Sequence, residues 1–183
     1  QTGFSIFRPS DGLDEGPVIL TRTVPIEPED TLGTLYFGKV FPLGVAGLIE
    51  AAERVLAGKD AAVKQYEAAA QYEGIVGAAE SRINWANHIE ITYNLIRGCD
   101  PSPGAWTTDA EGRLFLFDCE KRAARTLGEV RGQKVGQVVA VGGGSVTIHG
   151  QGGFIVAHRV RRDGGQKIAA GDAGIAAGTI LGC

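Results

Sequence analysis

The chain has 183 residues, of which 44% are hydrophobic and 21% charged, and its formal net charge is −3. A mean hydropathy of +0.02 is typical of a globular protein and excludes a disordered, strongly charged chain. The sequence shows no charged leader followed by an apolar core and no long apolar segment, so it predicts no signal peptide and no membrane partner. The length suits one domain, or one small domain with part of another.

Cysteine and histidine usage gives no sign of a metal site or of a disulfide framework. Cys99, Cys119 and Cys183 lie far apart and form no C-x-x-C pair. The three histidines lack the helical spacing of metal ligands. We therefore expect no bound metal, and free thiols in a reducing compartment.

Short strands and one long helical stretch are predicted for the first part of the chain. Gly3–Phe7 and Val18–Ile26 are the predicted strands, and a turn-rich loop separates them. An apolar stripe then predicts a helix, which Pro42 kinks or restarts and which Gly58 ends. Residues 59–80 hold few large apolar side chains and several alanines, so we interpret them as a linker.

The stretch Ser81–Thr107 organises the second half of the chain. Its apolar residues recur at helical spacing and predict a helix, with Asn87 as the N-cap and Gly98 as the residue that ends it. Trp85 and Trp106 lie on either side of this helix. We expect Trp106 to be largely buried beside it.

After residue 107 the pattern changes to short strands separated by glycine-rich turns. The predicted strands are Leu114–Asp118, Gln137–Val141, Val146–His149, Phe154–Val160 and Gln166–Ala169. Gly142–Ser145 predicts a hairpin turn, because it lacks the lysine and the following helix of a phosphate-binding loop. Short strands at this spacing predict a small closed or partly open barrel.

Charge is distributed unevenly along the chain. Residues 1–80 contain 6 Lys and Arg against 12 Asp and Glu, whereas residues 81–183 contain 12 against 9. The change supports a division into residues 1–58, a linker over 59–80, and a second unit over 81–183. The candidates for a basic patch that contacts RNA are Lys134, Arg159, Arg161 and Arg162.

Several of these motifs, taken in order, resemble formyltransferases that use 10-formyltetrahydrofolate. The resemblance is carried by I-N-W from Ile83, P-x-P-G-A-W-T from Pro101, GFSIF at Gly3–Phe7 and GLDEG at Gly12–Gly16. It implies an α/β plus β architecture, in which the last strands and helix of a Rossmann-like formyl-transfer domain precede a small OB-like β-barrel. It also implies a cytoplasmic enzyme of one-carbon metabolism, with the folate as co-substrate.

The resemblance also implies where the chemistry occurs. The family's catalytic Asn, the His two residues after it and the catalytic Asp would all lie upstream of Gln1, so we expect no catalytic residue in this chain. Gln1, Thr2 and Gly3 would lie next to the folate loop. The chain has no methionine, and we expect that it lacks the N-terminal part of its own domain and is inactive alone.

The formyl acceptor stays open at this point. Gly3–Phe7, Tyr72–Gly74 and Ile83–Trp85 resemble the folate-hydrolysing branch, in which water is the acceptor. The basic surplus of the second half favours initiator methionyl-tRNA instead, and a sugar-nucleotide amine is a third acceptor. A non-enzymatic alternative is a stand-alone OB-type RNA-binding module over residues 81–183, although the sequence shows no basic stripe interleaved with aromatic residues.

Overall fold

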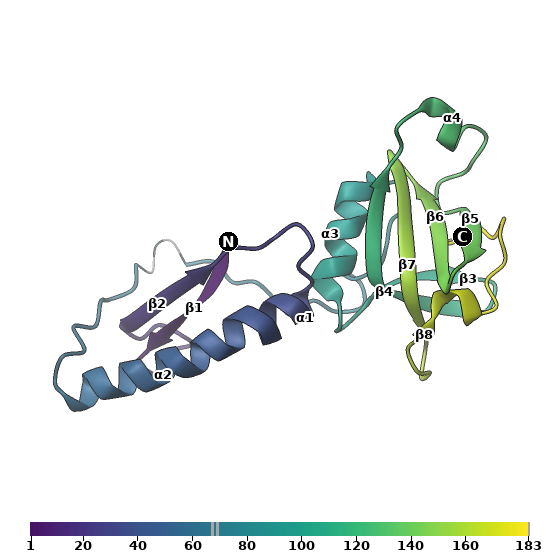
Figure 1. The fold of residues 1–183 in the computed structure, drawn as a ribbon. Coiled ribbons are helices and arrows are strands. Elements are labelled where there is room, and N and C mark those ends of the chain that lie inside the picture. The colour runs from purple at the N-terminus through teal and green to yellow at the C-terminus, as the bar shows by residue number, and fades with distance from the viewer. Residues whose placement is uncertain (67, 69, 183) are drawn as a thin grey trace. The chain divides into compact units, whose positions relative to one another are not determined.

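The computed structural model describes residues 1–66, 68 and 70–182. Contacts divide the chain into unit 1, Gln1–Ile75, and unit 2, Val76–Cys183. Unit 1 contains the strands β1 and β2 and the helices α1 and α2, whereas unit 2 contains α3, α4 and the strands β3 to β8 (Figure 1). The predicted domain limits at residues 58 and 81 stay predictions.

Unit 1 consists of a two-stranded antiparallel sheet with a long helical stretch packed on it. The sheet pairs β1 (Thr2–Phe7) with β2 (Val18–Val24), as predicted. The helical stretch comprises α1 (Leu32–Leu35), a π-helical turn (Tyr36–Val40) and α2 (Phe41–Leu56). Pro42 lies in the first turn of α2, where no N–H is needed, so it restarts the helix as expected.

A glycine sets the distance between α2 and the sheet of unit 1. A Cβ atom on Gly47 would lie 2.7 Å from the ring of Phe4 and 3.3 Å from the side chain of Leu20. Only glycine therefore lets the helix approach both strands this closely. Gly47 and Ala51 are the buried residues of α2, so the contact uses small side chains.

The residues after α2 return to the sheet of unit 1. Val63 and Val18 exchange two backbone hydrogen bonds of 2.8 and 2.9 Å. The side-chain amide of Gln65 donates to the carbonyl oxygens of Asp14 and Gly16, both at 2.7 Å. The first part of the stretch that we interpreted as a linker is thus bound to unit 1.

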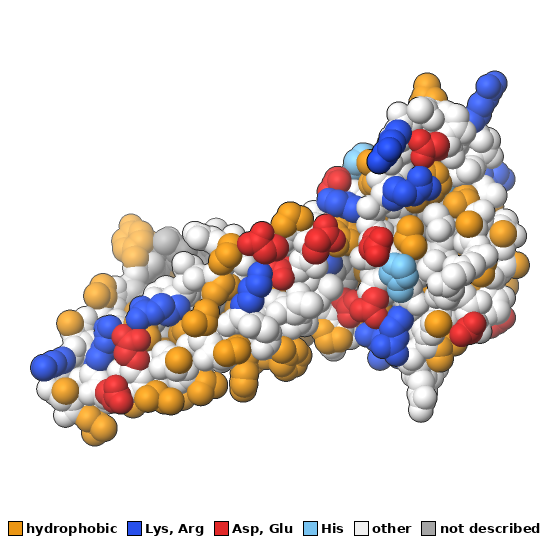
Figure 2. Space-filling model, viewed as in Figure 1, with side chains coloured by type: hydrophobic (Ala, Val, Ile, Leu, Met, Phe, Trp, Pro, Cys, Tyr) orange, Lys and Arg blue, Asp and Glu red, His pale blue; other side chains and the backbone are white. Residues whose placement is uncertain are grey.

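Much of the apolar surface of the helical stretch in unit 1 is uncovered. The 25 residues Leu32–Leu56 are long and apolar enough to cross a membrane by length and composition. An 18-residue window within them has a mean hydropathy of 1.5, and 6% of this window is buried. The expectation of no long apolar segment was therefore wrong for this stretch. Figure 2 shows hydrophobic side chains gathered over this helix. The same length and composition fit a helix that is covered by another protein surface as well as they fit a membrane-spanning helix.

The central helix of unit 2, α3, spans Ile89–Cys99. The helix prediction is confirmed, but both of its ends differ from the predicted ones. His88 is the N-cap instead of Asn87, and its Nδ1 accepts the N–H of Glu90 at 3.3 Å. At the other end the helix continues through Gly98, because the residue that must be extended is Asp100, which precedes Pro101.

Unit 2 has a six-stranded antiparallel sheet in the order β3-β4-β7-β6-β5, with β8 paired to β7. The strands are β3 (Ala105–Asp109), β4 (Gly112–Ala123), β5 (Val138–Gly142), β6 (Ser145–Gly150), β7 (Gly153–Arg162) and β8 (Ile168–Ala169). Two short helical segments, α4 (Leu127–Val130) and a 3-10 turn (Ala170–Asp172), complete the unit. The predicted hairpin is confirmed, since Gly143 and Gly144 connect β5 to β6 with φ values of 59° and 77°.

The OB-like barrel is not confirmed, because in the part of the chain that the structure describes β3 and β5 do not pair with each other. The C-terminal segment 178–182 hydrogen-bonds toward both ends of the sheet instead. Gly178 N–H donates to the carbonyl oxygen of Val138 in β5 at 2.7 Å, and Gly182 N–H donates to that of Thr108 in β3 at 2.8 Å. The sheet is thus open, with its two end strands linked through this segment.

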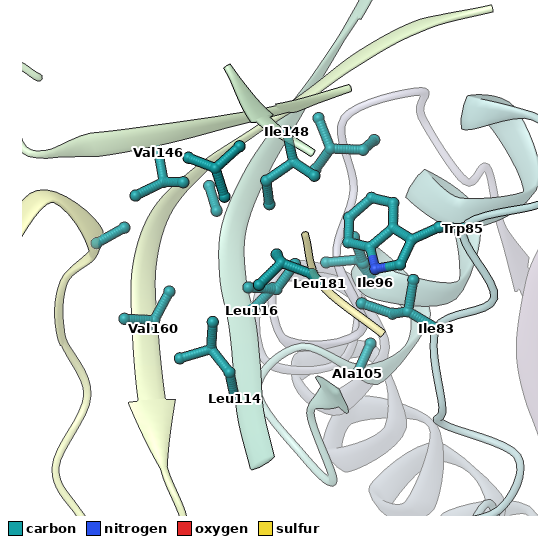
Figure 3. Packing of buried hydrophobic residues seen from close by; sticks show 14 of the residues in the cluster. Ile83, Trp85, Ile96, Ala105, Leu114, Leu116, Val146, Ile148, Val160 and Leu181 are labelled. Carbon is teal, nitrogen blue, oxygen red and sulfur yellow. The ribbon is translucent and has the colours of Figure 1, made fainter. Parts of the chain in front are cut away.

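The core of unit 2 lies between α3, the sheet and the C-terminal segment. Figure 3 shows its side chains converging from α3, the sheet and the segments before and after them, among them Ile83, Ile96, Leu116, Ile148, Val160 and Leu181. Trp85 joins this core with 5% of its surface exposed. Its Nε1–H donates to Oγ1 of Thr107 at 3.0 Å, so the one polar atom of the indole is paired.

Trp106 lies outside this core, so it is not the core residue beside α3 that we expected. Side chains alternate along β3, and Ala105 and Thr107 are the buried ones. Trp106 is half-buried on the opposite face of the strand, where its Nε1–H donates to the carbonyl oxygen of Ala78 at 2.6 Å. The tryptophan that the fold buries is Trp85.

We predict that Trp85→Ala destabilises unit 2 far more than Trp106→Ala does. The first change leaves a cavity in the core and should cost about 3–5 kcal/mol. The second removes a half-buried indole ring outside the core and two cation–π contacts of about 0.5–1 kcal/mol each. Urea unfolding followed by circular dichroism measures both losses, and equal losses would contradict the assignment of Trp85 as the core residue.

We also predict that residues 76–183 fold alone, whereas residues 1–75 do not. Unit 2 contains a continuous hydrophobic core, whereas α2 in unit 1 buries little more than Gly47 and Ala51. Separate expression and thermal melting by circular dichroism test this difference. A cooperative melting transition for residues 1–75 would contradict it.

Candidate functional site

The predicted folate-side residues lie at the start of β1. Thr2 and Gly3 pair with Val24 and Thr23 of β2, and Gln1 precedes the strand and is exposed. A Cβ atom on Gly3 would lie 2.0 Å from the carbonyl oxygen of Arg22. The close approach of the two strands is therefore enough to explain why residue 3 is a glycine, without any contact to folate. The folate-side role of these three residues stays a prediction.

Of the four basic residues predicted to form a patch, Arg162 is committed to an ion pair. Its Nη1 and Nη2 donate to Oδ1 and Oδ2 of Asp109, both at 2.7 Å, and Glu111 lies 3.1 Å from Nη2. The hydrogen bonds from Arg162 hold the pKa of the Asp109 carboxyl below its ordinary value, against the opposite effect of burial. The Asp109 side chain is only 7% exposed, so this bidentate pair ties the end of β7 to the end of β3.

The other three predicted basic residues do not form one patch with Arg162. Arg159 donates through Nη2 to the carbonyl oxygen of Lys167 at 3.0 Å. Arg161 is two residues further along the same face of β7, and its guanidinium lies over the rings of two phenylalanines of β4. Lys134 lies in the loop before β5, whereas β6 separates β5 from β7. The structure thus brings together Arg159 and Arg161 only.

A row of arginine and aromatic side chains crosses this face of the sheet. The guanidinium carbons of Arg82 and Arg113 lie 5.5 and 4.8 Å from the ring centroid of Trp106. Trp106 pairs with Phe115, and Phe115 pairs with Arg161, whose guanidinium carbon lies 4.6 Å from the Phe115 centroid. We call these five residues, Arg82, Trp106, Arg113, Phe115 and Arg161, the cationic face.

The sequence gives no local signal for the cationic face. Its members come from four extended segments, of which only β3 and β4 follow each other directly along the chain. In β4 the residues that alternate with core leucines are themselves phenylalanines, so the run LFLF of Leu114–Phe117 hides the two-sided pattern. Only the strand pairing places Arg161 beside Phe115.

A cavity of about 510 Å³ adjoins this row in unit 2. Arg82 and Asn84 are exposed residues on its wall, and Trp85, Val135 and Leu181 are among the residues that line the rest. The cavity therefore combines one guanidinium and one amide with apolar side chains. Such a mixed lining suits a small ligand with an anionic group and a flat apolar part.

The two described cysteines, Cys99 and Cys119, are free thiols. Burial raises the pKa of the Cys99 thiol, and burial together with the Asp100 and Asp118 carboxylates raises that of Cys119. Both effects disfavour the reactive thiolate. Within the same residues, no group of three or more His, Cys, Asp and Glu side chains is placed to hold a metal ion.

Unit 2 therefore belongs to a class of small domains in which one helix packs against an open antiparallel sheet. Residues 76–174 match the family described as the formyl transferase C-terminal domain. This match covers more than half of the chain. The chain belongs to the formyl transferase C-terminal domain family, as the resemblance implied.

Two curated relatives carry the match further. Over 117 residues, or 64% of this chain, it is 40% identical to the mitochondrial 10-formyltetrahydrofolate dehydrogenase of Homo sapiens, but these residues form only 13% of that protein. Over 168 residues, or 92% of this chain, it is 29% identical to the methionyl-tRNA formyltransferase of Nitrosospira multiformis and covers 52% of it. The chain thus spans between about an eighth and a half of the relatives' length.

The fold of most of the chain also occurs in a solved structure. HypX from Aquifex aeolicus, solved in complex with tetrahydrofolic acid, superposes with a TM-score of 0.75. The superposition covers 91% of this chain and 28% of HypX, at 20% sequence identity. At this identity the likeness shows a shared fold of mixed helices and sheets.

We predict that the Asp109–Arg162 pair stabilises unit 2 near neutral pH and loses its contribution in acid. Because the folded pKa of Asp109 is depressed, its contribution is present above the ordinary value of 3.8 and is lost as the pH falls through the folded pKa. Asp109→Asn should cost about 1–3 kcal/mol at pH 7 and progressively less as the pH falls below 3.8.

Urea unfolding between pH 7 and pH 3 measures this difference. Asp163→Asn is the matched control. The Asp163 carboxylate also pairs with an arginine, at 3.5 Å from Nε of Arg113, but its side chain is 61% exposed, so water weakens the pair. This control should leave the stability nearly unchanged. Parallel acid profiles for the wild type and Asp109→Asn would contradict the prediction.

Proposed function

We propose that the chain is the C-terminal portion of an enzyme that takes the formyl group from 10-formyltetrahydrofolate. The observation that carries the proposal is the family match over residues 76–174. The names of the relatives support the folate as co-substrate, since both a 10-formyltetrahydrofolate dehydrogenase and a methionyl-tRNA formyltransferase are among them. A cytoplasmic location is part of the same proposal.

We further propose water as the formyl acceptor, which makes the reaction a hydrolysis. The dehydrogenase relatives reach 40% identity, whereas the methionyl-tRNA formyltransferase reaches 29%. The motifs Tyr72–Gly74 and Ile83–Trp85, which resemble the hydrolysing branch, support the same choice. Methionyl-tRNA is the second candidate acceptor, favoured by the 92% of this chain that the match to its formyltransferase covers.

The uncovered apolar face of unit 1 suggests how the active enzyme is completed. A groove of about 300 Å³ is lined by side chains of β1 and the helical stretch, among them Phe4, Ile6, Phe41, Val45 and Leu48. In the described part of unit 1, β2 forms the bridge to Val63 on its outer side, and no strand pairs with the outer side of β1. Both features fit a larger sheet, so we propose that a preceding segment of the same protein occupies them.

In this arrangement the catalytic Asn, His and Asp that the family resemblance implies belong to the preceding segment. Formyl transfer needs hydrogen-bond donors for a tetrahedral oxyanion and a group that moves protons. Gln1, Thr2 and Gly3, at the start of β1, would then lie beside the folate. Unit 1 supplies the scaffold of this site, and the attacking water would be activated by residues outside the chain.

We predict that the chain alone releases no tetrahydrofolate from 10-formyltetrahydrofolate above a buffer blank. Addition of the preceding polypeptide should restore release, because it supplies the catalytic residues and covers the apolar groove. Leu48→Glu should weaken this restoration at least tenfold, since it places a charge in the groove. Absorbance spectroscopy of tetrahydrofolate formation measures both effects.

Leu13→Glu is the matched control for this experiment. Leu13 is also an exposed leucine of unit 1, 75% accessible compared with 59% for Leu48, but it does not line the groove. Release of tetrahydrofolate by the unassisted chain would refute the absence of catalytic residues. Equal effects of the two substitutions would refute the docking surface.

A further inference from the structure

We propose that the cavity of unit 2 beside Arg82 binds a small organic carboxylate with an apolar body. The residues that line this cavity all belong to unit 2, and they come from the segments 79–86 and 180–182 and from Val135. Binding at this cavity does not depend on the formyl chemistry of the intact protein, which we assign to residues outside the chain.

The charged groups at the cavity favour an anion. Arg82 is exposed on its wall, and no Asp or Glu is among the described residues that line it. Within the described part of the chain Arg82 makes no ion pair, and its guanidinium carbon lies 5.5 Å from the ring centroid of Trp106. Glu80, the acidic residue closest to Arg82 in sequence, does not line the cavity, and its Oε2 accepts the N–H of Gly77 at 2.9 Å. One guanidinium charge is therefore available to balance one negative charge on a ligand.

Asn84 adds a hydrogen-bond donor to the same lining. Its Oδ1 accepts the N–H of Ala86 at 3.0 Å, which fixes the orientation of the side-chain amide. The Nδ2 group then remains for a ligand, and it can only donate hydrogen bonds. A guanidinium binds a carboxylate through two parallel N–H groups, and an amide N–H can donate to the same oxygens. The two exposed polar side chains of the lining are therefore both donors, as a carboxylate requires.

Backbone hydrogen bonds and core packing hold the cavity walls in place. The N–H of Ile83 donates to the carbonyl oxygen of Trp106, and the N–H of Leu181 donates to that of Gly136, both at 2.8 Å. Ile83, Trp85 and Leu181 belong to the core of unit 2 and lie close together in Figure 3. A ligand can therefore bind without first ordering a loop, and loop ordering is one of the costs that lower affinity.

The volume and the apolar part of the lining define the rest of the ligand. A volume of about 510 Å³ lies within the range of roughly 300–1,000 Å³ that is typical of small-molecule sites. Formate is much too small to fill it. Val135, Ile180 and Trp85 contribute apolar side chains to the lining. The ligand is thus an apolar body about the size of two fused rings that carries one carboxylate.

The test uses the full chain and 2-naphthoate, which has two fused rings and one carboxylate, with isothermal titration calorimetry at pH 7. A ligand of this size should bind one site per chain with a Kd of about 0.05–1 mM. Arg82→Gln should raise the Kd about tenfold or more, because it removes the charged donor. Asn84→Asp should have a similar effect, because it keeps the acceptor for the N–H of Ala86 and places a negative charge in the lining.

The matched control is Arg113→Gln. The guanidinium carbon of Arg113 also lies near Trp106, 4.8 Å from the ring centroid, but Arg113 does not line the cavity. This variant should change the Kd less than about twofold. The neutral analogue naphthalene-2-carboxamide should bind the wild type about tenfold more weakly than 2-naphthoate, and 2-naphthyl phosphate should bind no more tightly, because one guanidinium matches one negative charge. Circular dichroism melting without ligand shows that each variant is folded.

Several outcomes would overturn the proposal. The first is no saturable binding of 2-naphthoate by the wild-type chain up to 10 mM. The second is an equal loss of affinity in Arg82→Gln and Arg113→Gln, which would place the ligand on the cationic face outside the cavity, or an unchanged Kd in Asn84→Asp. The third is equal affinity for the carboxylate and the carboxamide, or tighter binding of the phosphate, which would contradict a carboxylate ligand.

Discussion

The burial of Trp85 is the constraint on which the rest of unit 2 depends. Its ring lies in the core between α3 and the C-terminal segment, and its N–H is bonded to Thr107 of β3. Gly136 and Gly182 press against the indole from two other segments, so that a Cβ atom on either would lie 3.2 or 3.0 Å from it. Both glycines have positive φ values, 78° and 82°, which other residues adopt only with strain. One side chain thus joins β3, the approach to β5 and the C-terminal segment.

In unit 1, by contrast with the buried tryptophan of unit 2, small residues make the internal contact and large apolar side chains are exposed. Unit 1 packs its strands on α2 through small residues such as Gly47 and leaves large apolar side chains such as Leu48 on the outside. A large exposed apolar surface of this kind marks a site that contacts another protein surface. This contrast is one reason why we propose that the chemistry belongs to a protein longer than this chain.

Local patterns in the sequence predicted the helices and strands well. The pairing of distant strands decides which side chains are buried and which residues contact each other, and local patterns do not predict this. The apolar period of α3, the proline after Asp100 and the glycines between β5 and β6 are local signals, so the helix and the hairpin were predictable. Trp85 and Trp106 look alike in sequence, and only the alternation along β3 separates the buried ring from the half-buried one. Arg161 and Arg162 are neighbours, yet one stacks on Phe115 and the other pairs with Asp109. Likewise, whether a set of short strands closes into a barrel depends on the pairing of its two ends, which no local pattern encodes.

The most direct test of the account is an assay of the intact protein with 10-formyltetrahydrofolate and no acceptor other than water. The proposed function predicts that tetrahydrofolate and formate appear in equal amounts, and that added methionyl-tRNA neither accelerates the reaction nor becomes formylated. Formylation of methionyl-tRNA without hydrolysis would contradict water as the acceptor. Absence of turnover with either acceptor would contradict the assignment to a formyl-folate enzyme.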